Sequence, residues 1–136
     1  MSDYIVTNGR TIDGDVADVE IRDGVIERVA PAGEGDPDAF ADDRRYDAGG
    51  RLITPPLVEP HVHLDATGTA GDPSWNDSGT LAEGIEVWAE YKADVTVDDI
   101  LDRATKTVEW YASHGVTRIR THADTTEPSL STVEAL

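Results

Sequence analysis

Two histidines separated by one residue are the part of this sequence best placed to do chemistry. His61 and His63 close an apolar run that begins at Pro55, and Asp65 follows two positions later. In a β-strand, residues two apart point to the same face, so the imidazoles would stand side by side, about 6 to 7 Å apart at Cβ. Imidazoles at that spacing can share one metal ion at metal–nitrogen distances of about 2.1 Å. On a helix the pair would diverge by about 200° and could not do so.

The pair does not complete a metal site by itself. A catalytic zinc ion takes three protein ligands and a water, and a histidine in a strand can also have a purely structural role. The strand interpretation is supported by alternation, because the apolar residues Val58, Val62 and Leu64 interleave with the polar residues Glu59, His61 and His63. An apolar outer face and a polar inner face suit a barrel strand covered by helices.

A second strand that could contribute to the same site is predicted at residues 116–124. Its alternation places Arg118, Arg120, His122 and Asp124 on one face. We consider Asp65, His122 and Asp124 as residues that could orient a metal-bound histidine; a structural role, such as hydrogen bonding at a loop end, is the alternative for each. Glu59 and Arg120 are expected to face inward on neighbouring strands and to form an ion pair, because an unpaired buried charge is costly.

The residues before the His-x-His strand show the pattern of a small sheet. Asp23-Gly24 predicts a tight hairpin, and Asn8-Gly9 predicts another turn. Residues 31–43 lack periodicity and should form a solvated loop. A sheet of this size is marginal alone and is expected to need a partner sheet. The short strands are expected at residues 4–7, 17–21, 25–29 and 51–54.

Helical patterns follow the His-x-His strand, after a long loop at 66–78 of the kind that often forms an active-site wall. Thr80 with Glu83, and Ser131 with Glu134, resemble capping boxes that open helices. Thr96 is expected to cap a helix that runs to about residue 113. The expected buried faces are Leu81, Ile85, Trp88 and Ala89 in the first helix and Ile100, Leu101, Ala104, Val108, Tyr111 and Ala112 in the second.

Strands separated by helices indicate an α/β fold with a parallel sheet. A (β/α)₈ barrel takes about 250 residues, and two barrel strands are predicted here. We therefore interpret residues 1–54 as an N-terminal β-strand segment and residues 55–136 as the first part of a barrel in a larger enzyme.

Composition narrows the function further. With 28 acidic residues against 11 Lys and Arg, the formal charge is −17, which disfavours binding to nucleic acid or an anionic membrane. An acidic, solvating surface of this kind suits a high-salt cytoplasm. The chain has no cysteine, which excludes disulfides and thiolate zinc sites, including those of His/Cys/Cys nucleobase deaminases. No apolar run or leader predicts a membrane span or secretion, so a cytoplasmic location is expected.

Residues 50–63, GRLITPPLVEPHVH, resemble the opening of the amidohydrolase superfamily. Residues 56–90 are similar, more narrowly, to the bacterial-type cytosine deaminase subfamily, and RTHAD at 120–124 matches it too. The run WNDSGTL at 75–81 narrows the resemblance most, because the His-x-His pair is shared by the whole superfamily.

The resemblance implies a distorted (β/α)₈ barrel with a β-sandwich built from both chain ends. It implies one divalent ion, Fe²⁺ or Zn²⁺, held by His61 and His63 together with a histidine and an aspartate from later strands. The implied reaction is hydrolytic deamination of cytosine, or of a related nitrogen heterocycle, in pyrimidine salvage. The family's acid–base residues lie beyond Leu136, so no catalytic residue is assigned here, and the chain alone is expected to be inactive.

Other assignments stay open. The substrate could be a triazine or a guanidine-type compound, and the chain could be a non-catalytic product of a truncated or split gene. The resemblance also allows a homo-oligomer for the full-length enzyme.

Overall fold

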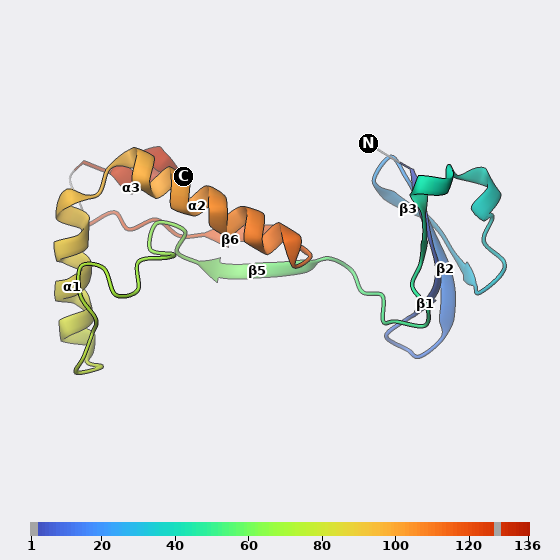
Figure 1. Cartoon of the computed structure of the whole chain (residues 1–136), viewed down its shortest axis with the longest axis horizontal. Coiled ribbons are helices and arrows are strands. Elements are labelled where there is room, and N and C mark those ends of the chain that lie inside the picture. Colours follow the sequence, from blue (N-terminus) through green and yellow to red (C-terminus); the bar gives the residue numbers. More distant parts are fainter. Residues whose placement is uncertain (1–2, 127–128) are drawn as a thin grey trace. The chain divides into compact units, whose positions relative to one another are not determined.

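Two structural units make up the chain, Met1–Pro55 and Pro56–Leu136, and the computed structural model describes residues 3–126 and 129–136 (Figure 1). The α/β class expected from the sequence is confirmed.

The first unit is a four-stranded sheet of β1 (Tyr4–Arg10), β2 (Val16–Arg22), β3 (Val25–Pro31) and β4 (Arg45–Asp47). The strand order in this sheet is β3-β2-β1-β4. Antiparallel pairing joins the first three strands, and β4 runs parallel to β1. Asp23 and Gly24 form the predicted hairpin turn with φ values of 51° and 79°, as a turn with two left-handed residues requires. Two short 3₁₀ helices, η1 (Pro37–Ala39) and η2 (Asp42–Arg44), lie within or beside the predicted loop.

Two predictions for this unit were wrong. Asn8-Gly9 is no turn between strands: it lies inside β1, where the register with β2 shifts and Asn8 has a φ of 54°. The backbone N–H of Asn8 donates instead to the carboxylate of Asp18 at 3.0 Å. The strand expected at 51–54 is reduced to one bridge between Leu52 and Arg10, because left-handed Gly49 and Gly50 turn the chain just before it.

A buried aspartate sits in the middle of β2. Asp18 is 2% exposed, and its carboxylate accepts hydrogen bonds from the backbone N–H groups of Asn8, Gly33 and Gly35. Burial raises the pKa of Asp18, but the three hydrogen bonds outweigh it and leave the pKa below its ordinary value. The charged side chain thereby ties β1 and the loop after β3 to the central strand.

The second unit contains two parallel strands, β5 (Leu57–Val62) and β6 (Val116–Thr121), connected through two helices. These are α1 (Leu81–Asp94) and α2 (Val97–Ser113), and a short helix α3 (Ser131–Ala135) packs on α2 (Figure 1). Ile100 and Ala104 of α2 are buried, as is Leu64 just after β5. The strand–helix–helix–strand–helix order agrees with the prediction.

The ends of α2 follow the predicted signals. Thr96 accepts from the N–H of Asp99, whose carboxylate in turn accepts from the N–H of Thr96, so a full capping box opens the helix. After its last residue, Gly115 takes a φ of 82°, the left-handed conformation that glycine accommodates at a helix C-terminus.

Other helix predictions were wrong in detail. Leu81 and Ile85 of α1 are 81% and 59% exposed, and no residue of α1 is buried. The capping box of α1 is half formed: Thr80 accepts from the Glu83 N–H, but the Glu83 carboxylate binds Ser78. Helix α3 has Leu130, in a left-handed conformation, as its N-cap residue, with no side-chain cap. In α2 the predicted apolar positions Leu101, Val108 and Ala112 are exposed.

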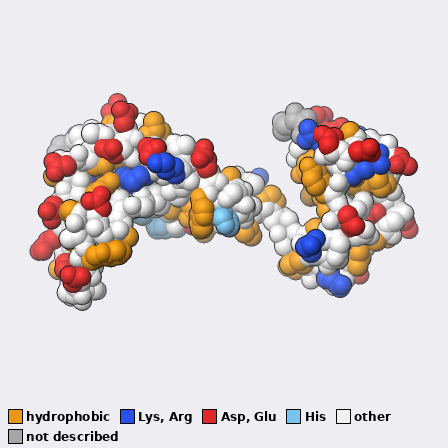
Figure 2. All heavy atoms as spheres, viewed as in Figure 1, with side chains coloured by type: hydrophobic (Ala, Val, Ile, Leu, Met, Phe, Trp, Pro, Cys, Tyr) orange, Lys and Arg blue, Asp and Glu red, His pale blue; other side chains and the backbone are white. Residues whose placement is uncertain are grey.

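Acidic side chains spread over the visible face of each unit (Figure 2). In the part of the chain that the structure describes, no helix combines the length and apolarity needed to cross a membrane.

Candidate metal centre

A β-bulge in β5 decides which side chains face the helices. The step from Glu59 to Val62 on β5 matches the step from Ile119 to Thr121 on β6, so β5 carries one extra residue. The bulge includes Pro60, which has no N–H to contribute to a ladder. Because paired residues share a face, Glu59 and Val62 point to the same side, and His61 points to the other.

The bulge overturns the ion pair predicted between Glu59 and Arg120. Glu59 faces α2, where its carboxylate accepts a hydrogen bond from the hydroxyl of Tyr111 at 3.2 Å; it also accepts from the N–H of His61 at 3.0 Å. Arg120 follows Ile119, the partner of Glu59, and so belongs to the opposite face. No ion pair joins the two side chains, both of which lie in the described ranges. The simple alternation predicted for this strand missed the extra residue.

Three imidazole rings gather at the ends of the two strands. The ring centroids of His61 and His63 are 5.7 Å apart, and that of His122 lies 4.1 Å from His61 and 5.6 Å from His63. The N–H of His122 donates to the carbonyl of Val62 at 2.8 Å, which holds the end of β6 against the end of β5. The structure thus brings together three of the predicted site residues from two strands.

The environment of His122 disfavours a positive charge. Its burial lowers the pKa of the imidazole, and the positive potentials of His61, Arg120 and His63 lower it further. Its Nδ1 atom is buried without a hydrogen-bond partner. A neutral ring, with a nitrogen lone pair available, is the form in which histidine accepts a proton or binds a metal.

Asp65 is completely buried behind the histidines. Its Oδ2 accepts from the backbone N–H of Asp124 at 2.7 Å, and its Oδ1 lies 3.4 Å from Nδ1 of His63. Arg103 of α2 donates to the backbone carbonyls of Asp65 and Thr67 at 3.0 and 2.7 Å. The loop after β5 is therefore fixed to the end of β6 and to α2.

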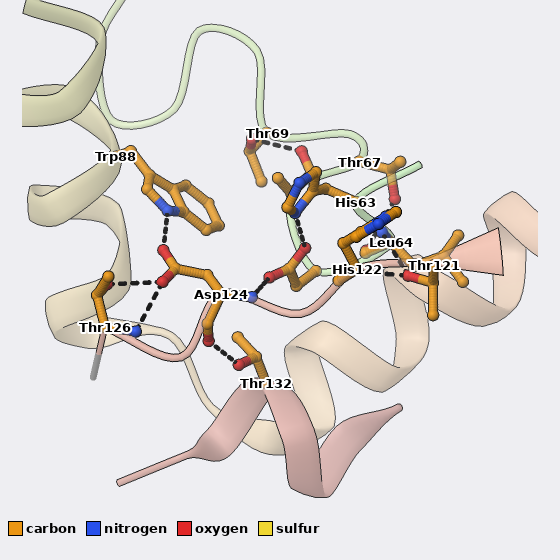
Figure 3. Close-up of polar contacts among 12 residues, drawn as sticks. His63, Leu64, Thr67, Thr69, Trp88, Thr121, His122, Asp124, Thr126 and Thr132 are labelled. Atoms are coloured by element: carbon orange, nitrogen blue, oxygen red, sulfur yellow. Dashed lines mark hydrogen bonds and ion pairs between the residues drawn. The ribbon is translucent and has the colours of Figure 1, made fainter. Parts of the chain in front are cut away.

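The carboxylate of Asp124 is directed to α1 (Figure 3). It accepts from Nε1 of Trp88 at 2.7 Å and from Nζ of Lys92 at 2.9 Å, and Thr126 donates to it from both its backbone and its hydroxyl. Burial raises the pKa of Asp124, but these hydrogen bonds, with Lys92 adding charge, bring it well below its ordinary value. The hydroxyl of Thr132 donates to the Asp124 carbonyl.

Sequence reasoning missed this network. Helical periodicity assigned Trp88 to the core, but the side chain is half-buried and its indole N–H donates to the carboxylate of Asp124, in the segment after β6. Lys92 lies one turn further along α1, on the same face as Trp88. This i, i+4 spacing is the sequence signal that could have indicated that Trp88 and Lys92 share a partner.

The donor set fits part of a metal site. Two imidazoles are ligands that suit zinc or iron(II), and the buried Oδ1 of Asp65, which accepts no hydrogen bond, lies beside His63. Among residues 3–126 and 129–136, however, no three His, Asp or Glu side chains are arranged to hold an ion. The assignment of His61 and His63 as ligands stays a prediction.

This chain is similar to known hydrolases in both sequence and structure. The amidohydrolase family model matches residues 44–135. Crystal structures of 5-methylcytosine deaminase from Klebsiella pneumoniae, one liganded with phosphonocytosine and one with 5-fluorocytosine, are 43% identical over 96% of this chain, with a TM-score of 0.83. N-isopropylammelide isopropylaminohydrolase from Burkholderia multivorans ATCC 17616 is 27% identical over 90% of this chain, with a TM-score of 0.67. No curated protein matches.

The chain spans about a third of the length of these solved structures: 32% and 31% of the two deaminase chains and 29% of the aminohydrolase chain. The family match covers more than half of the chain, from just before β4 to the end of α3. On that match, the chain belongs to the amidohydrolase family.

Proposed function

We propose that this chain forms the N-terminal part of a metal-dependent hydrolase that deaminates cytosine or a closely related pyrimidine. The observation that carries the proposal is the convergence of His61, His63 and His122 at the ends of β5 and β6. The 43% identity to an enzyme named as a 5-methylcytosine deaminase supports the substrate class.

In this proposal His61 and His63 hold one divalent ion, Zn²⁺ or Fe²⁺, and the remaining ligands come from later barrel strands. The bound ion would supply Lewis acidity that activates a water for attack on the ring carbon bearing the amino group. His122 packs against His61, and its own imidazole stays neutral at the edge of the site. Asp65 and Asp124 fix the strand ends behind the rings.

Metal binding tests the ligand assignment. Titration of the chain with Zn²⁺, followed by calorimetry, should show one weak site, because two imidazoles are half of a tetrahedral shell. His61→Ala and His63→Ala should each weaken binding at least about tenfold. His114→Ala, which removes an exposed histidine beyond α2, is the matched control and should leave binding unchanged. Equal binding by all four proteins would contradict the assignment.

Activity tests the reaction. Ammonia release should be absent with the 136 residues alone, since the described residues contain no complete ion-binding group. It should appear with cytosine when the chain is extended by the later strands of a related barrel. Ammonia release by the unextended chain would contradict this partial-site proposal, and an extended chain that binds zinc but ignores cytosine would contradict the substrate.

A triazine substrate is the second candidate, favoured by the 27% identity to an enzyme named as an N-isopropylammelide isopropylaminohydrolase. Release of isopropylamine from an N-isopropyl aminotriazine, compared with release of ammonia from cytosine by the same extended chain, separates the two.

The charge of −17 supports a proposal about the working environment, a salt-rich cytoplasm. Salt screens repulsion between like charges, so the urea concentration at the midpoint of unfolding should rise with potassium chloride. A midpoint that falls or stays level would argue against it.

A further inference from the structure

We propose that Asp65 is the positioning residue for His63: it holds the imidazole in the tautomer with the proton on Nδ1, leaving the lone pair of Nε2 for a metal ion. This inference rests on the proposed function, because it concerns how one of the proposed ligands is presented. It does not depend on which metal or substrate is bound.

The first support is the unequal use of the two carboxylate oxygens. Asp65 is 0% exposed. Its Oδ2 accepts from the N–H of Asp124 at 2.7 Å, but its Oδ1 is buried without any hydrogen bond. A buried carboxylate oxygen left in that state is costly, so a donor is expected beside it. The nitrogen found beside it is Nδ1 of His63, at 3.4 Å.

The geometry leaves a small movement to complete the contact. The distance of 3.4 Å exceeds the usual range of about 2.7 to 3.2 Å for an N–H···O bond. The side chain of His63 is 47% exposed and can turn toward Oδ1. Asp65 itself is held on both sides, by the N–H of Asp124 and by Arg103, which donates to its backbone carbonyl. The carboxylate is therefore the fixed partner, and the ring adjusts to it.

The chemistry of a carboxylate selects one tautomer. An ionised carboxylate only accepts hydrogen bonds, so it favours the ring form that carries its proton on Nδ1. In that form Nε2 is the nitrogen with the lone pair, and the hydrogen bond also makes it a better metal ligand. A ring with the opposite tautomer would carry its proton on Nε2 and could not bind the ion through that nitrogen.

Asp65→Asn tests the assignment with little change in shape. The asparagine carbonyl can still accept from the N–H of Asp124, which leaves its NH₂ group facing Nδ1 of His63. Nδ1 must then accept, and the proton moves to Nε2. Two-bond ¹H–¹⁵N NMR spectra of the whole metal-free chain, at about pH 8 where ordinary imidazoles are neutral, should show the Nδ1–H form in the wild type and the Nε2–H form in the variant.

Asp102→Asn is the matched control. It makes the same change in an exposed aspartate of α2, whose carboxylate pairs with Lys106 at 2.6 Å rather than with a histidine. It should leave the tautomer of His63 as in the wild type. A tautomer change in both variants would show that the change does not depend on Asp65 and would overturn the inference. If Asp65→Asn fails to fold, the wild-type spectrum decides: a His63 ring protonated on Nε2 overturns it as well.

Zinc titration of the same proteins separates this inference from the proposed function. Asp65→Asn should weaken Zn²⁺ binding by about 10- to 100-fold, and Asp102→Asn should not. If the wild type binds no zinc but shows the Nδ1–H form that Asp65→Asn reverses, the metal site is wrong and the positioning role stands. If zinc binds equally to wild type and Asp65→Asn, and the tautomer does not move, the positioning role is wrong and the metal site stands.

Discussion

The imidazole of His122 stacks on that of His61, with ring centroids 4.1 Å apart and planes 25° from parallel. The two rings come from neighbouring strands, and the bond from the His122 N–H to the Val62 carbonyl sets the register that brings them together. His122 therefore covers one face of His61 and limits its rotation.

Removing this stack should destabilise the second unit. We expect His122→Ala to lower the free energy of unfolding by about 0.5 to 1.5 kcal/mol, the usual worth of an aromatic pair. His122→Phe keeps a flat ring and should recover most of the loss. Urea unfolding followed by circular dichroism measures both. If phenylalanine is no better than alanine, stacking is not what His122 contributes.

The carboxylate of Asp18 should make stability depend on pH in the acid range. Its pKa lies below the ordinary value of 3.8 in the folded chain, where burial opposes and three backbone N–H groups favour the charged form. The stabilisation is therefore fully present above about pH 4 and is lost as the pH falls through the lower folded pKa. Thermal unfolding at a series of pH values measures it.

Asp18→Asn should remove this acid-range dependence and cost about 1 to 3 kcal/mol at neutral pH. The amide has one acceptor oxygen where the carboxylate has two, so its NH₂ group would face at least one of the three backbone N–H donors. Asp13→Asn, an exposed position, is the control and should change stability little. An Asp18→Asn protein with the wild-type pH profile would refute the role of this carboxylate.

The indole of Trp88 should matter for its N–H and not only for its bulk. Trp88→Phe keeps an aromatic ring but removes the hydrogen bond to Asp124, which should cost about 1 to 3 kcal/mol because the acceptor is charged. Trp110 of α2 is 59% exposed, and Trp110→Phe should cost well under 1 kcal/mol. Urea unfolding compares them, and equal losses would argue that α1 is held by apolar contact alone.

The close approach of β1 to Ile53 should make Gly9 intolerant of a side chain. A Cβ atom at Gly9 would lie 2.7 Å from Cγ2 of Ile53 and 2.8 Å from its Cδ1. A β-branched side chain has little rotamer freedom to move away, so Gly9→Ala should cost about 1 to 3 kcal/mol. In the Gly9→Ala, Ile53→Ala double variant the clash disappears, and the loss should be smaller than the sum of the two single losses. Strictly additive losses in thermal unfolding would exclude the clash.

Local sequence signals predicted helix ends and turns well where neighbouring residues alone determine the backbone conformation. Thr96 and Gly115 mark the two ends of α2, and Asp23-Gly24 marks a hairpin, because caps and left-handed turns depend on neighbours in sequence. Asn8-Gly9 has the same composition as a turn but forms a bulge inside β1, since pairing with β2 and the carboxylate of Asp18 decide its conformation.

The site was predictable in part for the same reason. Strand periodicity placed His122 on the histidine face of β6, where the structure stacks it on His61. Glu59 was placed on the wrong face, because a single inserted residue reverses the alternation and leaves no signal in hydrophobicity. The contact of Trp88 with Asp124 joins α1 to the segment after β6, and nothing in either segment's own periodicity encodes it.

Because of the bulge at Pro60, the number of residues in β5 determines which side chains reach the site. Before the bulge, the side chain of Glu59 points toward α2 and binds Tyr111. After the bulge the alternation is reversed, so His61 points to the face of the sheet opposite to Glu59. Deleting Pro60 would restore simple alternation along β5. Either Glu59 would then turn away from Tyr111, or the imidazoles would turn toward α2. Pro60 has no reactive group of its own, yet the extra residue in β5 thus determines on which face of the sheet the histidines could bind an ion.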